Sequence, residues 1–219
     1  MDIQHYFPIW NKLTFAQKER IKDGSVKRTI KKGTVVRSEH TDCLGLLLIE
    51  QGQLRAYILS DEGREVTLYR LFNWDICLFS ASCMINSLQF EITIEAEKDT
   101  ALWIIPASIY QSVLQESAPL SNFTNEIMAS RLSEVIQLME QVMWKRVDKR
   151  LAAFLLEESA LEESHTLKLT HETIANHLGT AREVVTRILH DFQNEGMVKL
   201  TRGTVELTDI QKLKQLQHT

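Results

Sequence analysis

The stretch THETIANHLGTAREVVTRILHDFQNEGM, residues 170–197, constrains the fold more than any other part of the chain. Thr170 is a hydroxyl residue of the kind that caps helices, and apolar residues follow it at helical spacing. Gly179 then ends this first helix, because glycine adopts the left-handed backbone conformation at little cost. Thr180 is predicted to cap a second helix that ends before Gly196. The stretch therefore predicts two helices joined by a tight turn.

The second predicted helix has two chemically different faces. Its apolar face consists of Val184, Val185, Ile188, Leu189 and Phe192. Its polar face consists of Arg182, Glu183, Thr186 and Arg187. Arginine can bond guanine O6 and N7, and glutamate can accept from cytosine N4, so this polar face suits the major groove of DNA. An ordinary helical hairpin with a solvated charged face would show the same pattern.

The residues that follow the two helices favour DNA binding. MVKLTRGTVEL, residues 197–207, alternates like two short strands around Arg202-Gly203. Two helices around a tight turn, followed by such a hairpin, form a winged helix. We therefore predict binding to double-stranded DNA. The predicted DNA-binding residues are Thr180, Arg182, Glu183, Thr186, Arg187 and Arg202.

Composition is that of an ordinary soluble globular protein, with 44% hydrophobic and 25% charged residues. No apolar run approaches the roughly 20 residues that a membrane-spanning helix needs. The N-terminus, MDIQHYFPIWNK, lacks the pattern of a signal peptide. We therefore expect a cytoplasmic protein with no membrane contact. The three cysteines are then expected to be reduced thiols.

Net charge permits DNA binding without arguing for it. The chain carries −4 overall, and residues 144–219 hold 11 Lys and Arg against 11 Asp and Glu. A local basic cluster consists of Lys145, Arg146, Lys149 and Arg150. A dimer would double the few phosphate contacts that each half can make.

The N-terminal part of the chain changes from helical to strand-like patterning. Residues 1–22 are predicted to be mainly helical. The expected apolar anchors are Phe7, Trp10, Leu13, Phe15 and Ile21. From Val26 the period becomes two, and about eight short strands separated by glycine turns follow up to residue 105. No alternation of strands with helices is present, so we predict an α+β chain with an N-terminal antiparallel β-roll of the double-stranded β-helix or jelly-roll kind.

A long amphipathic helix is predicted to follow Pro106 and a short helix over residues 107–114. It begins near Pro119 and carries an apolar stripe with partly heptad spacing. The stripe residues assigned to a dimer seam are Met128, Leu132, Val135, Met139 and Val142. A stripe of this length favours a two-helix seam, although part of it would pack against its own domain. The predicted divisions are a β-roll sensor domain (1–118), a dimerisation helix (119–143) and a winged-helix domain (144–219), whose first helix covers residues 147–158.

A β-roll, a long helix and a winged helix in this order resemble the Crp/Fnr family of bacterial transcription regulators. The most specific part is TAREVVTRILHDFQNEGMV, which is similar to the family's recognition helix and its R/x-E-x-x-x-R pattern. The resemblance implies that Arg182, Glu183 and Arg187 read bases, and that the protein is a homodimer on a palindrome and not an enzyme. It also implies RNA polymerase as a partner. Half-sites like TGTGA or TTGAT are expected, and Arg182 favours the first.

The chain departs from the family members that bind cyclic AMP. In those members a glutamate holds the ribose, while an arginine and main-chain amides hold the phosphate. The corresponding stretch here is WDICLFSASCMINSLQFEITIEA, residues 74–96. The arginine position falls on Phe90, the next residue is Glu91, and the glutamate position falls near Phe79. A phosphate would lose a bidentate charge-assisted bond and face a carboxylate. We therefore expect an effector other than cyclic AMP.

Two other kinds of sensing remain open in this stretch. An apolar pocket would suit haem or a small hydrophobic effector, although the same side chains could simply fill the space. Its expected residues are Ile76, Leu78, Phe79, Met84, Leu88 and Phe90. Cys77 and Cys83 could form a redox pair or bind haem or a soft metal, with Cys43 on an earlier strand and His40 as a remote haem ligand. Buried structural cysteine is the alternative.

Several chemistries are not expected. The Fnr branch of the family holds an iron–sulfur cluster on N-terminal cysteines, but residues 1–42 contain none, and three cysteines are fewer than a cubane cluster usually needs. No metal-ligand spacing and no common catalytic motif occurs. A rival interpretation is a ligand-binding β-roll whose near-neutral C-terminal half docks a protein partner. That protein would show no salt-dependent binding to DNA.

Overall fold

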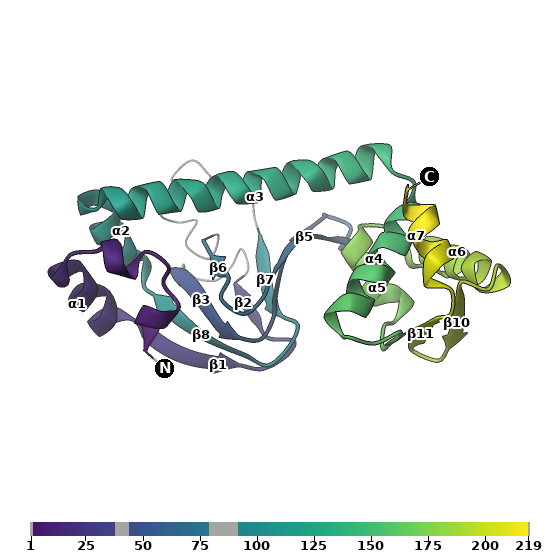
Figure 1. Ribbon diagram of the computed structural model, residues 1–219, viewed down its shortest axis with the longest axis horizontal. Helices are drawn as coiled ribbons and strands as arrows, with labels where there is room; N and C mark the ends of the chain where they lie inside the picture. The colour runs from purple at the N-terminus through teal and green to yellow at the C-terminus, as the bar shows by residue number, and fades with distance from the viewer. Residues whose placement is uncertain (1, 38–43, 79–91, 219) are drawn as a thin grey trace. The chain divides into compact units, whose positions relative to one another are not determined.

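The computed structural model describes residues 2–37, 44–78 and 92–218. The chain divides into two compact units, which are described separately. The first unit contains Met1–Ile58 and Leu68–Val135, and the second contains Leu59–Thr67 and Ile136–Thr219. Antiparallel sheets, a long helix and a helical C-terminal part with a small sheet confirm the predicted α+β class (Figure 1).

The N-terminal helical segment is shorter than predicted. Two short 3-10 helices, η1 (Ile3–His5) and η2 (Trp10–Lys12), come before α1 (Phe15–Gly24). Three of the expected anchors, Phe7, Leu13 and Ile21, are buried, and Trp10 packs at the edge of the same core. Phe15 was predicted as an anchor wrongly. It is the first residue of α1, and its side chain is 79% exposed.

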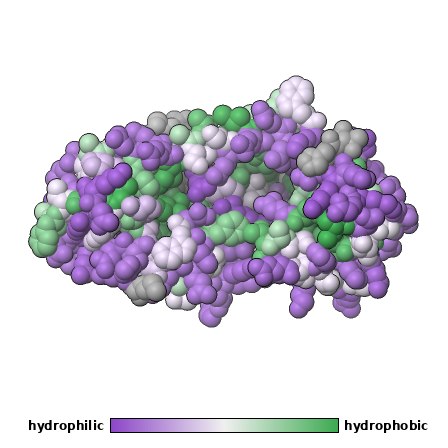
Figure 2. Space-filling view, in the orientation of Figure 1, coloured by the Kyte–Doolittle hydropathy of each residue, from purple (hydrophilic) through white to green (hydrophobic). Residues whose placement is uncertain are grey.

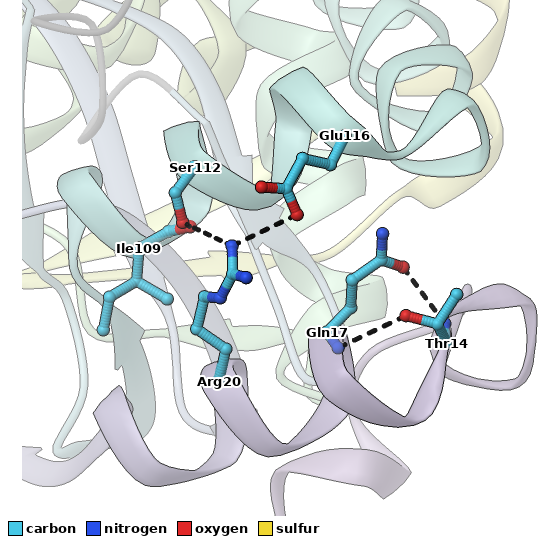
Figure 3. Close-up of polar contacts among 6 residues, drawn as sticks. All are labelled: Thr14, Gln17, Arg20, Ile109, Ser112 and Glu116. Carbon is cyan, nitrogen blue, oxygen red and sulfur yellow. Dashed lines mark hydrogen bonds and ion pairs between the residues drawn. The ribbon is translucent and has the colours of Figure 1, made fainter.

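A capping box fixes the start of α1. The Thr14 hydroxyl accepts from the main-chain amide of Gln17 at 3.4 Å, and the Gln17 side chain accepts from the amide of Thr14 at 3.0 Å (Figure 3). Both groups would otherwise have no partner at the end of the helix. One turn further on, Arg20 donates to Ser112 and Glu116 at 3.4 and 3.3 Å, and so joins α1 to α2 (Figure 3).

Two four-stranded antiparallel sheets form the β-roll. The strands are β1 (Val26–Ile30), β2 (Val35–Arg37), β3 (Leu46–Gln51), β4 (Leu54–Leu59), β5 (Glu65–Leu71), β6 (Ile76–Cys77), β7 (Thr93–Ala96) and β8 (Thr100–Ile105). One sheet has the order β1-β8-β3-β6, and the other has the order β2-β7-β4-β5. In the described residues between 26 and 105 there are thus eight strands, as the alternating pattern predicted.

The core of the roll lies between the two sheets. Leu54 and Ala56 of β4 and Ile94 and Ala96 of β7 lie in this core, and Ala56 lies opposite Ile94 in the register. β3 differs, because four consecutive residues of this strand, Leu46–Ile49, are all fully buried. They divide between two hydrophobic clusters, one inside the roll and one beneath the N-terminal helices. A continuous apolar run is expected of a strand that is covered on both faces.

Two helices follow the roll. The strands end at Pro106, as predicted, and α2 (Ala107–Glu116) is followed by α3 (Ala118–Trp144). The Tyr110 hydroxyl and the Thr124 hydroxyl lie 2.7 Å apart and join the two helices in a buried contact. Further along α3, Met128 packs against both hydrophobic clusters of the first unit.

Besides the C-terminal end of α3 and the start of β5, the described part of the second unit contains four helices and a small three-stranded sheet. Its elements are α4 (Val147–Leu161), β9 (Thr166–Leu167), α5 (His171–Leu178), α6 (Arg182–Asn194), β10 (Val198–Thr201), β11 (Thr204–Leu207) and α7 (Ile210–His218). The hairpin predicted around Arg202-Gly203 is confirmed as β10 and β11, and β9 pairs with β11 at its other edge. Neither β9 nor α7 was predicted from the sequence. The sequence signal for α7 was Asp209, a residue type that caps helices, followed by apolar residues three apart. In the structure the Asp209 side chain accepts from the main-chain amide of Lys212 at 3.0 Å.

One hydrophobic cluster holds the second unit together. Buried residues from α4, α5, α6, the sheet and α7 all contribute to it. No helix in residues 2–37, 44–78 and 92–218 is long and apolar enough to cross a membrane.

Candidate nucleic-acid interface

The turn between α5 and α6 has the predicted start and stop signals. The Thr170 hydroxyl accepts from the main-chain amide of Thr173 at 3.0 Å and caps α5. Gly179 follows the last residue of α5 with φ of 63°. Residues other than glycine rarely adopt this left-handed backbone conformation. The predictions for Thr170 and Gly179 are therefore confirmed.

The predicted cap of the second helix is wrong. The N-cap of α6 is Ala181, which makes no side-chain hydrogen bond, and the helix begins at Arg182. Thr180 lies one residue earlier, in the turn, where its main-chain amide donates to Ala175 at 3.1 Å. The turn is thus one residue longer than the hydroxyl at Thr180 suggested.

The faces of α6 follow the predicted pattern. Val185, Leu189 and Phe192 are buried, and Val184 and Ile188 are half-buried. Ile188 packs against the edge of the core. The remaining candidates divide by exposure. Arg182, Glu183 and Arg187 are exposed, and Thr186 between them is half-buried. One face of α6 is therefore anchored in the core, and the other presents two guanidinium groups and a carboxylate.

Thr186 makes contacts that sequence reasoning did not anticipate. Its hydroxyl donates to the main-chain oxygen of Arg182 at 2.9 Å. The Thr186 hydroxyl oxygen also lies 2.8 Å from Nδ1 of His171, the first residue of α5. The two helices are therefore tied by a side-chain bond across the turn.

His171 is an electrostatically sensitive part of this contact. Burial, the nearby Arg182 guanidinium and the His190 ring lower the pKa of His171. All three effects disfavour the imidazolium form of the ring. His171 was not a predicted site residue, because a single histidine at the start of a helix gives no sequence signal.

The wing carries the last predicted DNA-binding residue. Arg202 is exposed at the tip, beside Gly203, whose φ is 71°. The main-chain amide of Leu200 on β10 donates to the Gln193 side chain of α6 at 2.8 Å. The wing is therefore joined to the helix that carries the other candidate residues.

The basic cluster predicted over residues 145–150 contains two different kinds of residue. Lys145 and Arg146 are exposed, and Arg146 pairs with Asp148 at 2.9 Å. Arg150 is only 7% exposed, and its guanidinium donates to the main-chain oxygen of Leu178 at the end of α5. Burial lowers the pKa of Arg150. Arg150 therefore holds α4 against α5.

The candidate effector residues are only partly described. Phe79, Cys83, Met84, Leu88 and Phe90, together with His40 and Cys43, lie outside the described residues. Ile76, Cys77 and Leu78 are buried, and Cys77 is fully enclosed in the core of the roll. Burial and the neighbouring Cys77 thiol raise the pKa of Tyr69 well above its usual value. Among the described residues, no three His, Cys, Asp or Glu side chains group as metal ligands would.

The predicted seam residues on α3 differ in exposure. Met128 packs against its own unit, and Val135 is half-buried. Leu132, Met139 and Val142 are at least half exposed. Three further apolar residues, not among the predicted ones, extend this exposed stripe: Ile136, Met143 and Trp144.

Comparison with known proteins identifies the C-terminal helices. Residues 149–216 match the sequence profile of the Crp-like helix-turn-helix domain. A crystal structure of a protein from Eubacterium rectale, assigned to the Crp/Fnr family of transcriptional regulators, is 59% identical. The match covers 98% of this chain and 100% of that one, with a TM-score of 0.97.

Two curated proteins from Thermus thermophilus are more distant relatives. The cyclic AMP receptor protein is 25% identical over 171 residues, which is 78% of each chain. The transcriptional regulator SdrP is 29% identical over 128 residues, which is 56% of this chain and 60% of SdrP. The buried and exposed faces of α6, the wing and these similarities lead to one conclusion: the chain belongs to the Crp/Fnr family of DNA-binding transcription regulators, which are not enzymes.

Proposed function

We propose that this protein is a homodimer that binds a palindromic operator and regulates transcription by RNA polymerase under the control of an effector other than cyclic AMP. The observation that carries the proposal is the division of α6 into a buried and an exposed face. Val185, Leu189 and Phe192 fix the helix in the core. The exposed residues Arg182 and Glu183 then begin a helix of a length that fits a major groove.

The exposed apolar stripe of α3 supports the dimer. Its residues are Leu132, Ile136, Met139, Val142, Met143 and Trp144, which are between 48% and 79% exposed. Figure 2 shows a green hydrophobic patch at the middle of the upper edge of the view, where Figure 1 places α3, with purple polar residues beside it. A contiguous apolar surface of this kind is usually covered by a partner. A second copy of the same helix would cover it and place two recognition helices on one duplex.

The sequence of residues 74–96 supports an effector other than cyclic AMP. Family members that bind cyclic AMP share an arginine followed by a small hydroxyl residue. Phe90 and Glu91 occupy these two positions here. Cys77 is completely buried in the core, which favours a structural role for this cysteine over a redox or ligand role. Effector binding in the roll would act through α3, whose Met128 contacts both clusters of that unit.

The proposal is tested by binding to DNA. The first step is selection of bound sequences from a library of random duplexes. The second is titration of the selected duplex, and of a scrambled one, at several salt concentrations. We expect a palindrome, preference over the scrambled duplex, and affinity that falls with a log–log slope of about −0.9 per phosphate contacted. Binding that is absent or independent of salt would instead favour the rival function, in which the C-terminal half docks a protein partner.

The effector is tested on the same protein. An absorption spectrum and metal analysis of protein purified without oxygen would reveal haem or iron. Titration with cyclic AMP should leave the affinity for the selected duplex unchanged. An increase in affinity with cyclic AMP would contradict this part of the proposal without affecting the rest.

A further inference from the structure

The hydrogen bonds of Thr186 leave its hydroxyl no hydrogen to offer to DNA. The hydroxyl has one hydrogen, which it donates to the main-chain oxygen of Arg182 at 2.9 Å. When the hydroxyl donates to Arg182, the contact of 2.8 Å between the Thr186 hydroxyl and Nδ1 of His171 is donated by the histidine. Thr186 therefore acts as donor to its own helix and as acceptor from α5.

This arrangement also determines which nitrogen of His171 carries a proton. Nδ1 must be protonated, which is true of one neutral tautomer and of the imidazolium form. The lowered pKa of His171 favours the neutral ring, and titration then occurs at Nε2. The bond from Nδ1 to Thr186 is present in both charge states, so the position of the Thr186 side chain does not depend on pH.

With its hydrogen engaged, the hydroxyl can no longer donate to a base and keeps only one lone pair that could accept. The methyl group is the other part of the Thr186 side chain that can contact a base. Threonine in a helix commonly divides between two side-chain rotamers, because its hydroxyl can bond the preceding turn from both. The second bond, from His171, selects one of them. A threonine methyl makes apolar contact with the 5-methyl group of thymine, which cytosine and deoxyuracil lack. Thr186 lies on the turn between Arg182 and Arg187, which are both exposed.

We propose that His171 fixes Thr186 so that its methyl group reads the 5-methyl group of one thymine in each half-site. This inference rests on the proposed function, because it requires α6 to lie in the major groove. It changes the expected role of Thr186 from a polar contact to an apolar one. His171 is then a positioning residue, which acts on the base through Thr186.

The experiment replaces thymine by deoxyuridine in the duplex selected by the wild-type protein. Each symmetric pair of thymines is changed in turn, which removes two methyl groups and leaves all hydrogen bonds intact. We expect one pair to weaken binding by about 15-fold, because burial of one methyl-sized group corresponds to about fourfold in each half-site. The other pairs should change affinity less than twofold.

Variants separate the methyl group from the hydroxyl. Thr186→Val keeps a methyl group and should retain the discrimination against deoxyuridine. Thr186→Ser keeps only the hydroxyl and should lose the discrimination. His171→Ala should reduce it, and His171→Asn, whose amide can donate in place of Nδ1, should restore it. Thermal unfolding of each variant shows whether the domain is still folded.

The outcomes distinguish this inference from the function on which it rests. If the wild-type protein selects no duplex, the proposed function fails. If it binds a palindrome but tolerates deoxyuridine at every position, the proposed function stands and the role of Thr186 is overturned. Discrimination retained by Thr186→Ser would show that another side chain contacts the thymine methyl group and would also overturn it. Discrimination unchanged in His171→Ala would overturn the positioning role of His171.

Discussion

The guanidinium of Arg150 donates a hydrogen bond to the main-chain oxygen of Leu178, and so joins the first turn of α4 to the last residue of α5. The last carbonyls of a helix have no partner within the helix. Arg150 supplies one where the chain turns at Gly179 towards α6. The orientation of the candidate recognition helix therefore depends on a residue of α4 that cannot itself reach DNA, since only 7% of it is exposed.

Arg150→Met should destabilise the second unit by about 1–3 kcal/mol, because it leaves a buried carbonyl without its donor. Affinity for the selected duplex should fall as well. The matched control is Arg146→Ala, which removes an exposed ion pair to Asp148 and should cost at most about 1 kcal/mol. Chemical denaturation measures the free energy of unfolding of both variants. Equal stability of the two variants would show that the Arg150 bond does not hold the helices together.

Arg182→Ala should weaken binding to the selected duplex by about 1–3 kcal/mol and relax preference at one base pair of each half-site. The reason is the loss of the proposed bidentate contact between Arg182 and a guanine. Arg202→Ala on the wing is the comparison, since a phosphate contact should weaken all sequences equally and reduce the salt slope by about one. Competition titrations with single-base variants of the duplex give both results. Unchanged preference in Arg182→Ala would refute its role as a base reader.

A negative charge on the exposed stripe of α3 should dissociate the proposed dimer. Leu132→Glu and Met139→Glu each place a carboxylate where the proposed partner helix would bury it, which is costly without a partner charge. Sedimentation velocity should show monomer for both variants and dimer for the wild type. Gln141→Glu adds the same charge at an exposed position on the opposite side of α3 and should remain a dimer. A monomeric wild-type protein, or dimeric variants, would place the interface elsewhere.

Stability of the second unit should fall as the solution becomes acidic. The pKa of His171 is lowered in the folded protein from about 6.5, so the folded state binds a proton less readily than the unfolded state. The contribution of neutral His171 to the free energy of unfolding is fully present above pH 6.5. It is lost as the pH falls through the lower pKa that His171 has in the folded state. His171→Asn keeps a donor for Thr186 but does not titrate. The difference in midpoint temperature between this variant and the wild type should therefore depend on pH below about 6.5. A constant difference would contradict the prediction.

Features with a local signal were predictable from the sequence. Gly179 ends α5 because of its own backbone, and the faces of α6 follow from residues three and four apart. The eight strands of the roll follow from alternation and turns, although the pattern did not determine which strands pair. The one local error at this site was Thr180, where a hydroxyl residue suggested a cap one position too early.

Features that depend on distant partners were not predictable. Arg150 has the composition of a basic surface cluster, and only the fold shows that it is buried against Leu178. Thr186 was expected to be an ordinary polar contact, because nothing in the sequence indicates that His171, fifteen residues away, occupies its hydroxyl. In both cases the partner belongs to another helix, and its position depends on how the helices pack.

The bond between Gln193 and Leu200 has a consequence for how tightly the protein can bind. This bond joins α6 to the wing within one domain, so in the proposed complex the two would approach DNA together. Once α6 is seated in a groove, the approach of Arg202 to the backbone is an intramolecular event at high effective concentration. The wing can then add affinity without a second loss of translational freedom. Cutting this bond would lower the effective concentration while leaving every contact to DNA in place.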